Sequence, residues 1–421
     1  MSVTTIGNST ISIKNGNIGI GTTNPTSALT LFGDTRISGA ISGSVLKNTV
    51  DNNDLYSTFN TTNSATGKFL NWLTTVSNEA KRGWWSKATT PVFSTITASG
   101  TLIANGYTSG VLIPDGRVIF VPTDASTIGI FNPFTNLYSL GPSATGYCCG
   151  VLIPDGRVVC VPRDAANIGI YSPTTNSIQL ITPGASLPGG VFSFQYQGGV
   201  LLPNGNVAFI PFKANNIGIF NPLTSTFSVL TTNVPTSTDK YQGGVLLPDG
   251  RVICVPFSIG TIGIYTPAAD ASGLGTFTNT SVSATGYDGG VLLPDGRVVF
   301  APYTATTIGL YTPGTGEGTF TTASGITLAS GDKYIGGTLL PDGTVLLTNW
   351  GGTDMRLYDP IANTTSIPIT GITVYSYRNG VLIPDGRVIC PPGNVDGKIG
   401  IVSGFSPVSV ERCLHPCFNA F

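Results

Sequence analysis

The chain contains few charged residues and a single histidine. Of its 421 residues only 10% are charged, and the formal net charge at pH 7 is −1. A protein that binds nucleic acid needs a stripe or patch of Lys and Arg to neutralise phosphates, so this composition argues against nucleic acid as a partner. Low charge also removes much of the repulsion that keeps free monomers apart, which favours a protein packed inside an assembly.

Long apolar runs are also absent. No stretch approaches the roughly 20 consecutive apolar residues that a membrane-spanning helix needs. Residues 1–7 have neither the basic nor the apolar segment of a secretory signal. We therefore expect a chain without a membrane span that is synthesised in a cytoplasm.

What the sequence has instead is a repeat. A tyrosine and a glycine precede Val-Leu-Ile/Leu-Pro-Asp-Gly-Arg-Val, and Ile-Gly-Ile-Tyr/Phe-x-Pro follows, with variations, seven times. The prolines of its turn lie 40–49 residues apart, at Pro114, Pro154, Pro203, Pro248, Pro294, Pro341 and Pro384. A period of this length with short β-type runs is typical of a propeller or a solenoid. The repeats begin near residues 107, 147, 196, 241, 287, 334 and 377.

Each repeat predicts four strands. In the fourth repeat, residues 244–247 run into Pro248-Asp249-Gly250 and resume at 251–255, which predicts a tight hairpin. Residues 261–265 form a third strand, and the Thr-rich run 276–279 forms an exposed fourth. The first two runs are apolar at nearly every position, so both of their faces must be covered. Seven such units predict an all-β fold, a seven-bladed β-propeller of four-stranded blades.

One strand is needed to close the ring. Residues 91–100 resemble a fourth strand, but no first three strands precede them. We predict that they complete the seventh blade beside residues 381–383, 387–390 and 398–402, so that the propeller spans 91–405 and is followed by a tail at 406–421. The alternative closure uses residues 406–411.

The repeat resembles the kelch family, including the propeller of the galactose oxidase group, in its Leu-Pro-Asp-Gly-Arg-Val run over residues 107–403. It departs from the kelch pattern at the place where kelch units carry a diglycine and, later, a spaced Tyr and Trp: here the second strand runs into Val-Pro instead. The resemblance therefore implies a propeller fold and does not imply an activity. A copper oxidase of that group would need His and Tyr ligands, whereas this chain has only His415, outside the repeats.

Residues 1–45 have short β-branched stretches separated by Gly and Asn-Pro, with too few large apolar groups to fold alone. Their Ile-Gly-Ile-Gly-Thr-x-x-Pro stretch resembles tail fibres of phages and structural proteins of large double-stranded DNA viruses. That resemblance implies a fibre-like or anchoring segment, through which copies of the chain would associate.

A linker at residues 46–90 is predicted to contain an amphipathic helix at about 67–82. Phe69, Trp72, Leu73 and Val76 fall on one stripe of that helix. We expect the stripe to pack on the propeller or on a neighbouring copy.

Charged residues recur in the hairpin turns of the repeats. Because the same residues serve nearly every repeat, turn geometry and local charge pairing explain them better than an anion site or a pair of catalytic carboxylates. They are Asp115, Asp155, Asp249, Asp295, Asp342 and Asp385, with Arg117, Arg157, Arg251, Arg297 and Arg387.

The loops between the second and third strands vary most, and loops on one rim of a rigid scaffold are where binding usually resides. From them we predict a binding crown formed by Arg163, Lys213, Phe212, Phe257, Tyr303 and Trp350. Its rings could be exposed for contact with a protein or glycan, or packed and half-buried.

Sites for chemistry are scarce. Cys413, His415 and Cys417 fall short of a zinc site because a fourth ligand is missing, so free thiols or a disulfide are favoured over a metal. Cys160, Cys254 and Cys390 alternate with phenylalanine at one repeat position, which indicates core filling. No catalytic set, phosphate loop or cofactor fingerprint is found, and we expect no catalytic residues and no cofactor.

The sequence therefore favours a virion structural protein, associated with a capsid or fibre, whose propeller is a rigid platform for interaction and host attachment. Its expected partners are other virion proteins or copies of itself, and a host surface glycan or protein. The alternatives are a soluble glycan-binding or adaptor propeller and, third, an enzyme that acts on polysaccharide.

Overall fold

The structure is a computed structural model that describes residues 2–6, 9–14, 17–20, 29–31, 90–97, 106–183, 194–237, 239–329, 331–393 and 398–405. The chain divides into two compact units, Met1–Leu55 and Tyr56–Phe421. The predicted helix at 67–82, the stripe of Phe69, Trp72, Leu73 and Val76, and the tail at 406–421 lie outside the described residues.

The first unit contains a four-stranded sheet in the order β1-β2-β3-β4. Its strands are β1 (Ser2–Ile6), β2 (Ser9–Lys14), β3 (Asn17–Ile20) and β4 (Leu29–Leu31). The first three are antiparallel, and β3 pairs with β4 in parallel.

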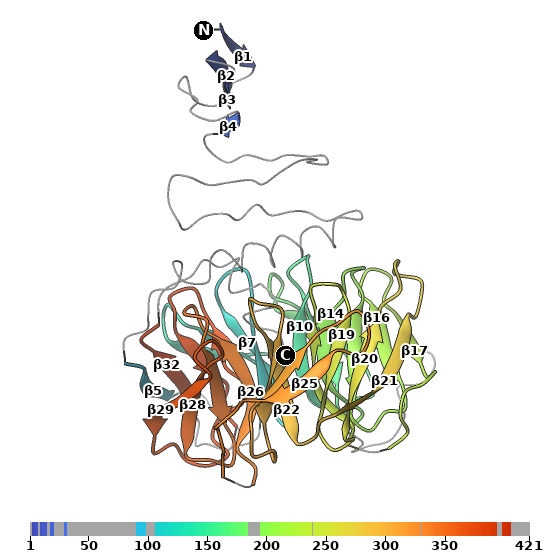
Figure 1. The fold of residues 1–421 in the computed structure, drawn as a ribbon. Coiled ribbons are helices and arrows are strands. Elements are labelled where there is room, and N and C mark those ends of the chain that lie inside the picture. The colour runs from blue at the N-terminus through green and yellow to red at the C-terminus, as the bar shows by residue number, and fades with distance from the viewer. Residues whose placement is uncertain are drawn as a thin grey trace. The chain divides into compact units, whose positions relative to one another are not determined.

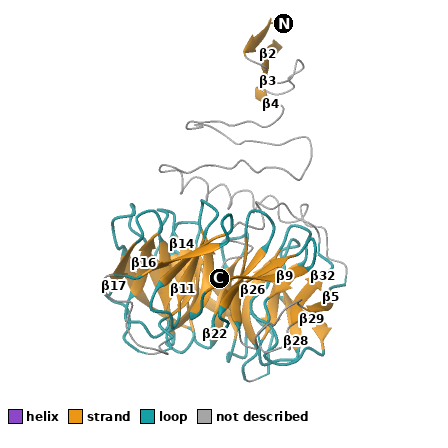
Figure 2. Cartoon of the chain, turned by 180° about the vertical axis from the view of Figure 1, so that it is seen from behind, coloured by secondary structure: helices purple, strands orange, loops and turns teal. Residues whose placement is uncertain are grey.

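The second unit is a ring of seven four-stranded antiparallel sheets, as the repeat predicts (Figure 1). Six sheets follow the chain without a crossover, and loops join the strands at both ends of the ring (Figure 2). No helix occurs among the described residues of this unit. The seven blades, from the innermost strand outward, are β6 (Tyr107–Leu112), β7 (Val118–Pro122), β8 (Thr127–Asn132) and β9 (Leu137–Ser143); β10 (Tyr147–Leu152), β11 (Val158–Pro162), β12 (Ile168–Ser172) and β13 (Ser177–Ile181); β14 (Tyr196–Leu201), β15 (Val207–Pro211), β16 (Ile217–Asn221) and β17 (Thr226–Leu230); β18 (Tyr241–Leu246), β19 (Val252–Pro256), β20 (Thr261–Thr266) and β21 (Thr276–Ser283); β22 (Tyr287–Leu292), β23 (Val298–Pro302), β24 (Gly309–Thr312) and β25 (Thr319–Thr322); β26 (Tyr334–Leu339), β27 (Val345–Asn349), β28 (Asp354–Asp359) and β29 (Thr364–Thr370); and β30 (Val381–Leu382), β31 (Val388–Cys390), β32 (Lys398–Ser403) and β5 (Val92–Thr97).

The last blade closes the ring with a strand from before the first repeat. β5 pairs with β32 in an antiparallel register from Ser403 opposite Val92 to Lys398 opposite Thr97. This confirms the predicted closure by the strand in residues 91–100 over the alternative that used 406–411. Blade seven therefore joins segments about 300 residues apart in the chain, a long-range pairing that a ring requires.

The core lies between the blades. All five residues of each second strand β7, β11, β15, β19, β23 and β27 are buried, so neither face of these strands meets water. The apolar side chains of one blade pack against those of the next, as Val121 and Ile128 of the first blade do with Tyr147 and Val158 of the second. Cys160, Cys254 and Cys390 are buried in these layers as free thiols.

Candidate functional site

The strand register separates the two sets of residues singled out from the sequence. In the fourth blade Tyr241 pairs with Pro256 at one end of the hairpin, and Leu246 pairs with Val252 at the other. The same pairing in the other blades gathers the loops after the second strands on one face of the ring, which we call the crown face. The Asp-Gly-Arg turns gather on the opposite face, which we call the turn face.

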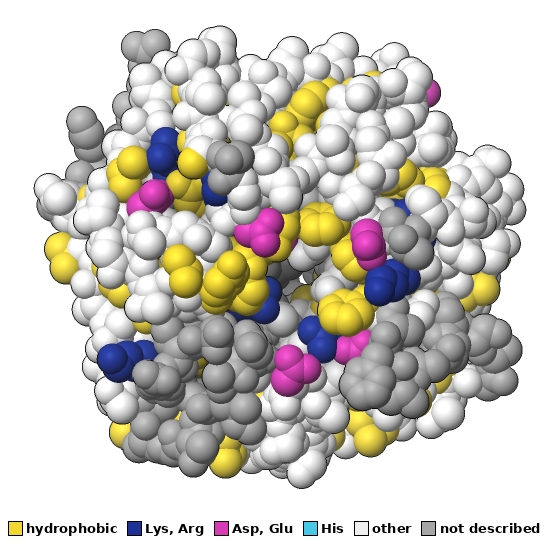
Figure 3. Space-filling view, turned by 90° about the horizontal axis from the view of Figure 1, so that it is seen from below, with side chains coloured by type: hydrophobic (Ala, Val, Ile, Leu, Met, Phe, Trp, Pro, Cys, Tyr) yellow, Lys and Arg dark blue, Asp and Glu magenta, His cyan; other side chains and the backbone are white. Residues whose placement is uncertain are grey.

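A cavity of about 260 Å³ opens at the axis on the crown face, and we call it the crown mouth. In a space-filling view of this face, hydrophobic side chains and charged side chains of both signs surround a central hollow (Figure 3). Each blade contributes to the lining the residue that follows its first tyrosine: Thr108, Cys148, Gln197, Gln242, Asp288, Ile335 and Arg378.

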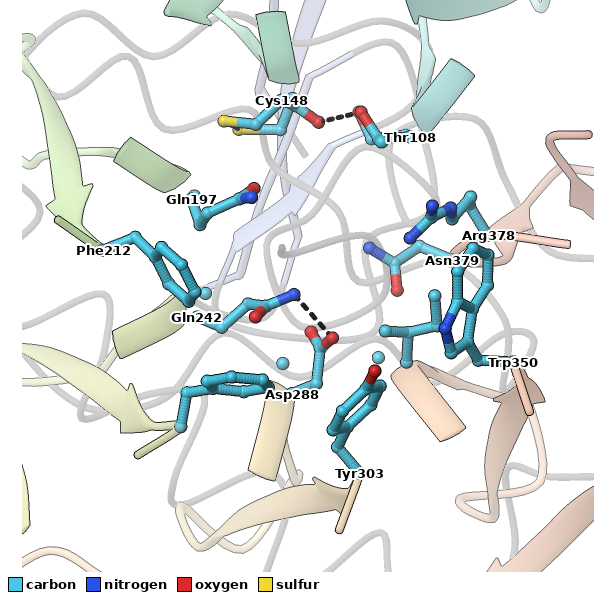
Figure 4. A pocket seen from close by; sticks show the side chains of 18 of the residues that line it. Thr108, Cys148, Gln197, Phe212, Gln242, Asp288, Tyr303, Trp350, Arg378 and Asn379 are labelled. Atoms are coloured by element: carbon cyan, nitrogen blue, oxygen red, sulfur yellow. Dashed lines mark hydrogen bonds between the residues drawn. The ribbon is translucent and has the colours of Figure 1, made fainter. Parts of the chain in front are cut away.

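These axial residues are the part of the site that the sequence analysis missed. They are of six residue types in the seven blades, although the tyrosine before them is constant and a glycine follows two residues later. Two variable positions between a constant tyrosine and a constant glycine, the first more variable than the second, were the signal that could have found them. The close view shows several of them converging on one space from different strands (Figure 4).

Glycines allow the innermost strands to come this close to the axis. Gly198, Gly243, Gly289 and Gly336 all have positive φ, from 64° to 131°. A Cβ added to Gly289 would lie 2.8 Å from the Cα of Gly336, and one added to Gly243 would lie 3.1 Å from the Cα of Gly289. In blades three to six the glycines therefore pack close together at the axis, whereas the other three blades carry Ser109, Cys149 and Asn379 at the same position.

Four of the six predicted crown residues form an aromatic wall around the mouth. The ring centroids of Phe212 and Phe257 are 5.5 Å apart, and those of Phe257 and Tyr303 are 5.3 Å apart. Trp350 lies edge-on to Tyr375 at 5.1 Å. Phe212 is buried and the other three predicted rings are half-buried, so the half-buried alternative describes them, and their remaining surface lines the cavity.

The other two predicted crown residues, Arg163 and Lys213, lie at one end of the aromatic wall. Arg163 pairs with Asp164 at 2.5 Å and with Asp124 of the preceding blade at 3.0 Å. Both cations also lie over the ring of Phe194, at 4.6 and 5.1 Å from its centroid. The carboxylates of this cluster are therefore already paired with a guanidinium.

A buried carboxyl group, that of Asp288, and the half-buried guanidinium of Arg378 face the mouth. Asp288 is 6% exposed, and its Oδ2 accepts a hydrogen bond of 2.6 Å from Nε2 of Gln242. Burial raises the pKa of Asp288 to about 8, against the opposing effects of Arg378 and Gln242. The carboxyl group is therefore largely protonated at neutral pH.

The guanidinium of Arg378 lies over an aromatic ring, and one of its donors has no hydrogen-bond partner among the described residues. Its Cζ is 3.5 Å from the ring centroid of Trp350. Burial lowers the pKa of its guanidinium to about 10, which leaves the group charged at neutral pH. Neither Nε of Arg378 nor Oδ1 of the adjacent Asn379 has a hydrogen-bond partner among the described residues.

The raised pKa of Asp288 predicts how the stability of the protein depends on pH. The pKa of Asp288 is about 8 in the folded protein and about 3.8 when the chain unfolds, so the unfolded state releases the proton first as pH rises. The carboxyl thus costs stability progressively between pH 4 and pH 8. We expect Asp288→Asn to be as stable as the wild type near pH 4 and more stable at pH 8, by a few kcal/mol in order of magnitude. Urea unfolding of both proteins across this range tests it, and a constant difference would contradict the assignment.

On the turn face, the predicted turn residues form ion pairs within their turns and hydrogen bonds to the neighbouring blades. Five Asp-Arg pairs form within the turns at 2.6–2.7 Å, from Asp115–Arg117 to Asp385–Arg387. The arginines also donate to carbonyl oxygens of the next blade, and Arg387 reaches Pro133 O at 2.7 Å across the closure. Asp342 bonds Thr344 instead, and blade three uses Asn204 and Asn206 to reach carbonyls of blade four. The turns thus tie neighbouring blades together.

No group of His, Cys, Asp and Glu in the described part of the chain could hold a metal ion. The candidate thiols Cys413 and Cys417 and the imidazole of His415 lie outside the described residues. The described residues also contain no helix that is long and apolar enough to span a membrane.

The fold places the chain in the class of seven-bladed β-propellers. No family model matches the sequence, and no curated protein matches it either. Among solved structures, a streptogramin B lyase is similar with a TM-score of 0.60 and 17% identity, over 76% of this chain and 99% of that one. The virginiamycin B lyase of Staphylococcus aureus, in a catalytically inactive form with quinupristin, has a TM-score of 0.60 and 18% identity, over 74% and 99%.

A fungal alcohol oxidase in complex with copper is similar with a TM-score of 0.56 and 13% identity, over 76% of this chain and 79% of that one. At these identities the similarities establish the propeller fold alone.

Proposed function

We propose that this protein is a virion structural protein whose propeller is a rigid recognition platform, with the crown mouth as the site that binds a surface glycan. The observation that carries the proposal is the axial ring of seven residues of six different types in an otherwise repetitive scaffold. Repeats that only had to pack would have no reason to vary at positions that face the axis.

The composition of the mouth suits a sugar ligand. Sugars have many hydroxyl groups, which amide side chains can serve as both donors and acceptors. Gln197, Gln242 and Asn379 line the mouth, and the aromatic rings beside them offer apolar faces. A rigid ring holds these groups in place before the ligand arrives, which lowers the entropic cost of binding.

The virion part of the proposal rests on residues 1–45, through their resemblance to viral fibre segments and their small apolar content. In this account the N-terminal arm joins the propeller to other virion proteins or to its own copies, and the crown faces a host surface. Quantitative mass spectrometry of purified particles would find this chain at high copy number. Its absence from particles would favour the alternative of a free glycan-binding propeller.

An enzyme remains the second candidate because of one observation. The raised pKa of Asp288 is a property of general acids. We nevertheless favour binding, because hydrolysis of a glycosidic bond by the usual route needs two carboxyl groups. Among the other nearby carboxylates, Asp124 and Asp164 are held by Arg163, and Asp332 accepts a hydrogen bond of 2.8 Å from the hydroxyl of Tyr303.

The test compares matched phenylalanines on the two faces. Phe257 lies in the middle of the aromatic wall, whereas Phe134 is 69% exposed in a loop on the turn face. On an array of surface glycans, we expect the full-length protein to bind a restricted set, Phe257→Ala to lose at least about tenfold in affinity, and Phe134→Ala to bind as the wild type does. Equal binding by both variants, or no glycan bound by the wild type, would overturn the proposal.

A further inference from the structure

We propose that the crown mouth selects a sugar that carries a carboxylate, such as a terminal uronic or sialic acid, with Arg378 as the group that binds the carboxylate. This inference rests on the proposed function and adds the chemical class of the ligand.

The first argument is that Arg378 has a hydrogen-bond donor without an acceptor among the described residues. A guanidinium has five N–H donors, and those in a buried position are normally satisfied. Here Nε has no partner among the described residues, and the ring of Trp350 covers one face of the group at 3.5 Å. The side chain is half-buried and lines the mouth, and a carboxylate from a ligand matches the planar fork of guanidinium donors.

The second argument is the charge of the groups around Arg378. Asp288 faces it across the mouth, Tyr303 lies beside Asp288, and Arg163 and Asp124 act on Arg378 from further away. Arg163 is paired with Asp124, so these two nearly cancel. Because burial keeps Asp288 largely protonated at neutral pH, Arg378 has no ionised partner within the mouth. The interior therefore favours one negative charge.

The third argument is the neutral part of the lining and its size. Apart from Arg378 and the paired Arg163, the mouth offers amides, hydroxyls, thiols, the protonated Asp288 and aromatic rings. That is more uncharged polar surface than a small carboxylate alone would use. The cavity of about 260 Å³ lies below the range of roughly 300–1,000 Å³ for drug-sized ligands, which favours one sugar over a long chain.

The experiment measures binding of four probes to the full-length protein by calorimetry at pH 7. The probes are the methyl glycosides of N-acetylneuraminic acid, glucuronic acid and glucose, and acetate. We expect at least one acidic sugar to bind about tenfold or more tightly than both methyl glucoside and acetate. In Arg378→Met the preference for the acidic sugar over methyl glucoside should fall to near one, whereas Arg157→Met on the turn face should keep it.

Two further measurements keep the test decisive if Arg378→Met fails to fold. Arg378→Lys keeps the charge but loses the fork, and it should retain part of the preference. In the wild type, affinity for the acidic sugar should fall about tenfold from pH 7 to pH 9 as Asp288 ionises opposite the ligand, and Asp288→Asn should remove that fall.

The outcomes separate this inference from the proposed function. If the protein binds glycans at the crown but prefers neutral sugars, or if Arg378→Met keeps the acidic preference, the inference is wrong and the proposed function stands. If acetate binds as tightly as the acidic sugars, the site recognises a carboxylate without a sugar, and the inference is again wrong. If no glycan binds at all, the proposed function fails first.

Discussion

A chain that begins at residue 100 should fail to form a stable propeller, whereas a chain that begins at residue 90 should fold. The two differ by the segment that contains β5, the outer strand of blade seven. Without β5 the edge of β32 is unpaired over six residues, and an open edge invites association with other chains. The side chains of Phe93 and Ile96, which pack against the core, would also be lost.

Thermal unfolding and sedimentation of both proteins check this result. The chain from residue 90 should unfold in one cooperative transition as a defined species. The chain from residue 100 should aggregate or unfold over a broad range at a lower temperature. Equal melting of the two proteins would mean that β5 does not hold the ring closed.

The second large effect is expected at the axis. Gly289→Ala and Gly343→Ala both place a side chain on a backbone with positive φ, 75° and 82°. That strain alone costs about 1–2 kcal/mol. At Gly343 an added Cβ meets nothing within 4 Å, whereas at Gly289 it lies 2.8 Å from the backbone of Gly336. We expect a loss near the strain alone for Gly343→Ala, and about 2 kcal/mol more for Gly289→Ala.

Denaturant unfolding of the two variants measures this difference directly. The shared strain cancels between them, so the remainder reports the contact between neighbouring blades at the axis. Equal losses would show that the innermost strands can move apart freely and that the axial ring is not rigid.

The architecture could be predicted because each blade repeats the same pattern of turn residues and apolar runs. The seven Pro-Asp-Gly or related turns predict seven blades, and the uninterrupted apolar runs predict strands that are covered on both faces. Closure was predictable because residues 91–100 had the pattern of a fourth strand with no blade of their own. The contacts of Arg251 and Arg387 with the next blade could not be predicted, because the acceptors are backbone carbonyl oxygens, which leave no pattern of side chains in the sequence.

The site was predicted in part. The crown loops supplied the aromatic wall, since variation among the loops of a repeat protein stands out in the sequence. The axial residues Asp288 and Arg378 were missed because they do not lie in the crown loops: Asp288 is inside β22, and Arg378 follows the isolated bridge at Tyr377. Their burial and their approach across the axis depend on the radius of the closed ring, which no local pattern encodes. The variable positions between a constant tyrosine and a constant glycine are the feature to seek in other propeller sequences.

The most direct test of the central claim is an experimental density map of the full-length protein with its bound glycan. The account predicts density for a sugar in the crown mouth, in contact with Arg378 and Gln242 and against the ring of Trp350. Density on the turn face or along the outer strands, with an empty mouth at saturating ligand, would contradict it.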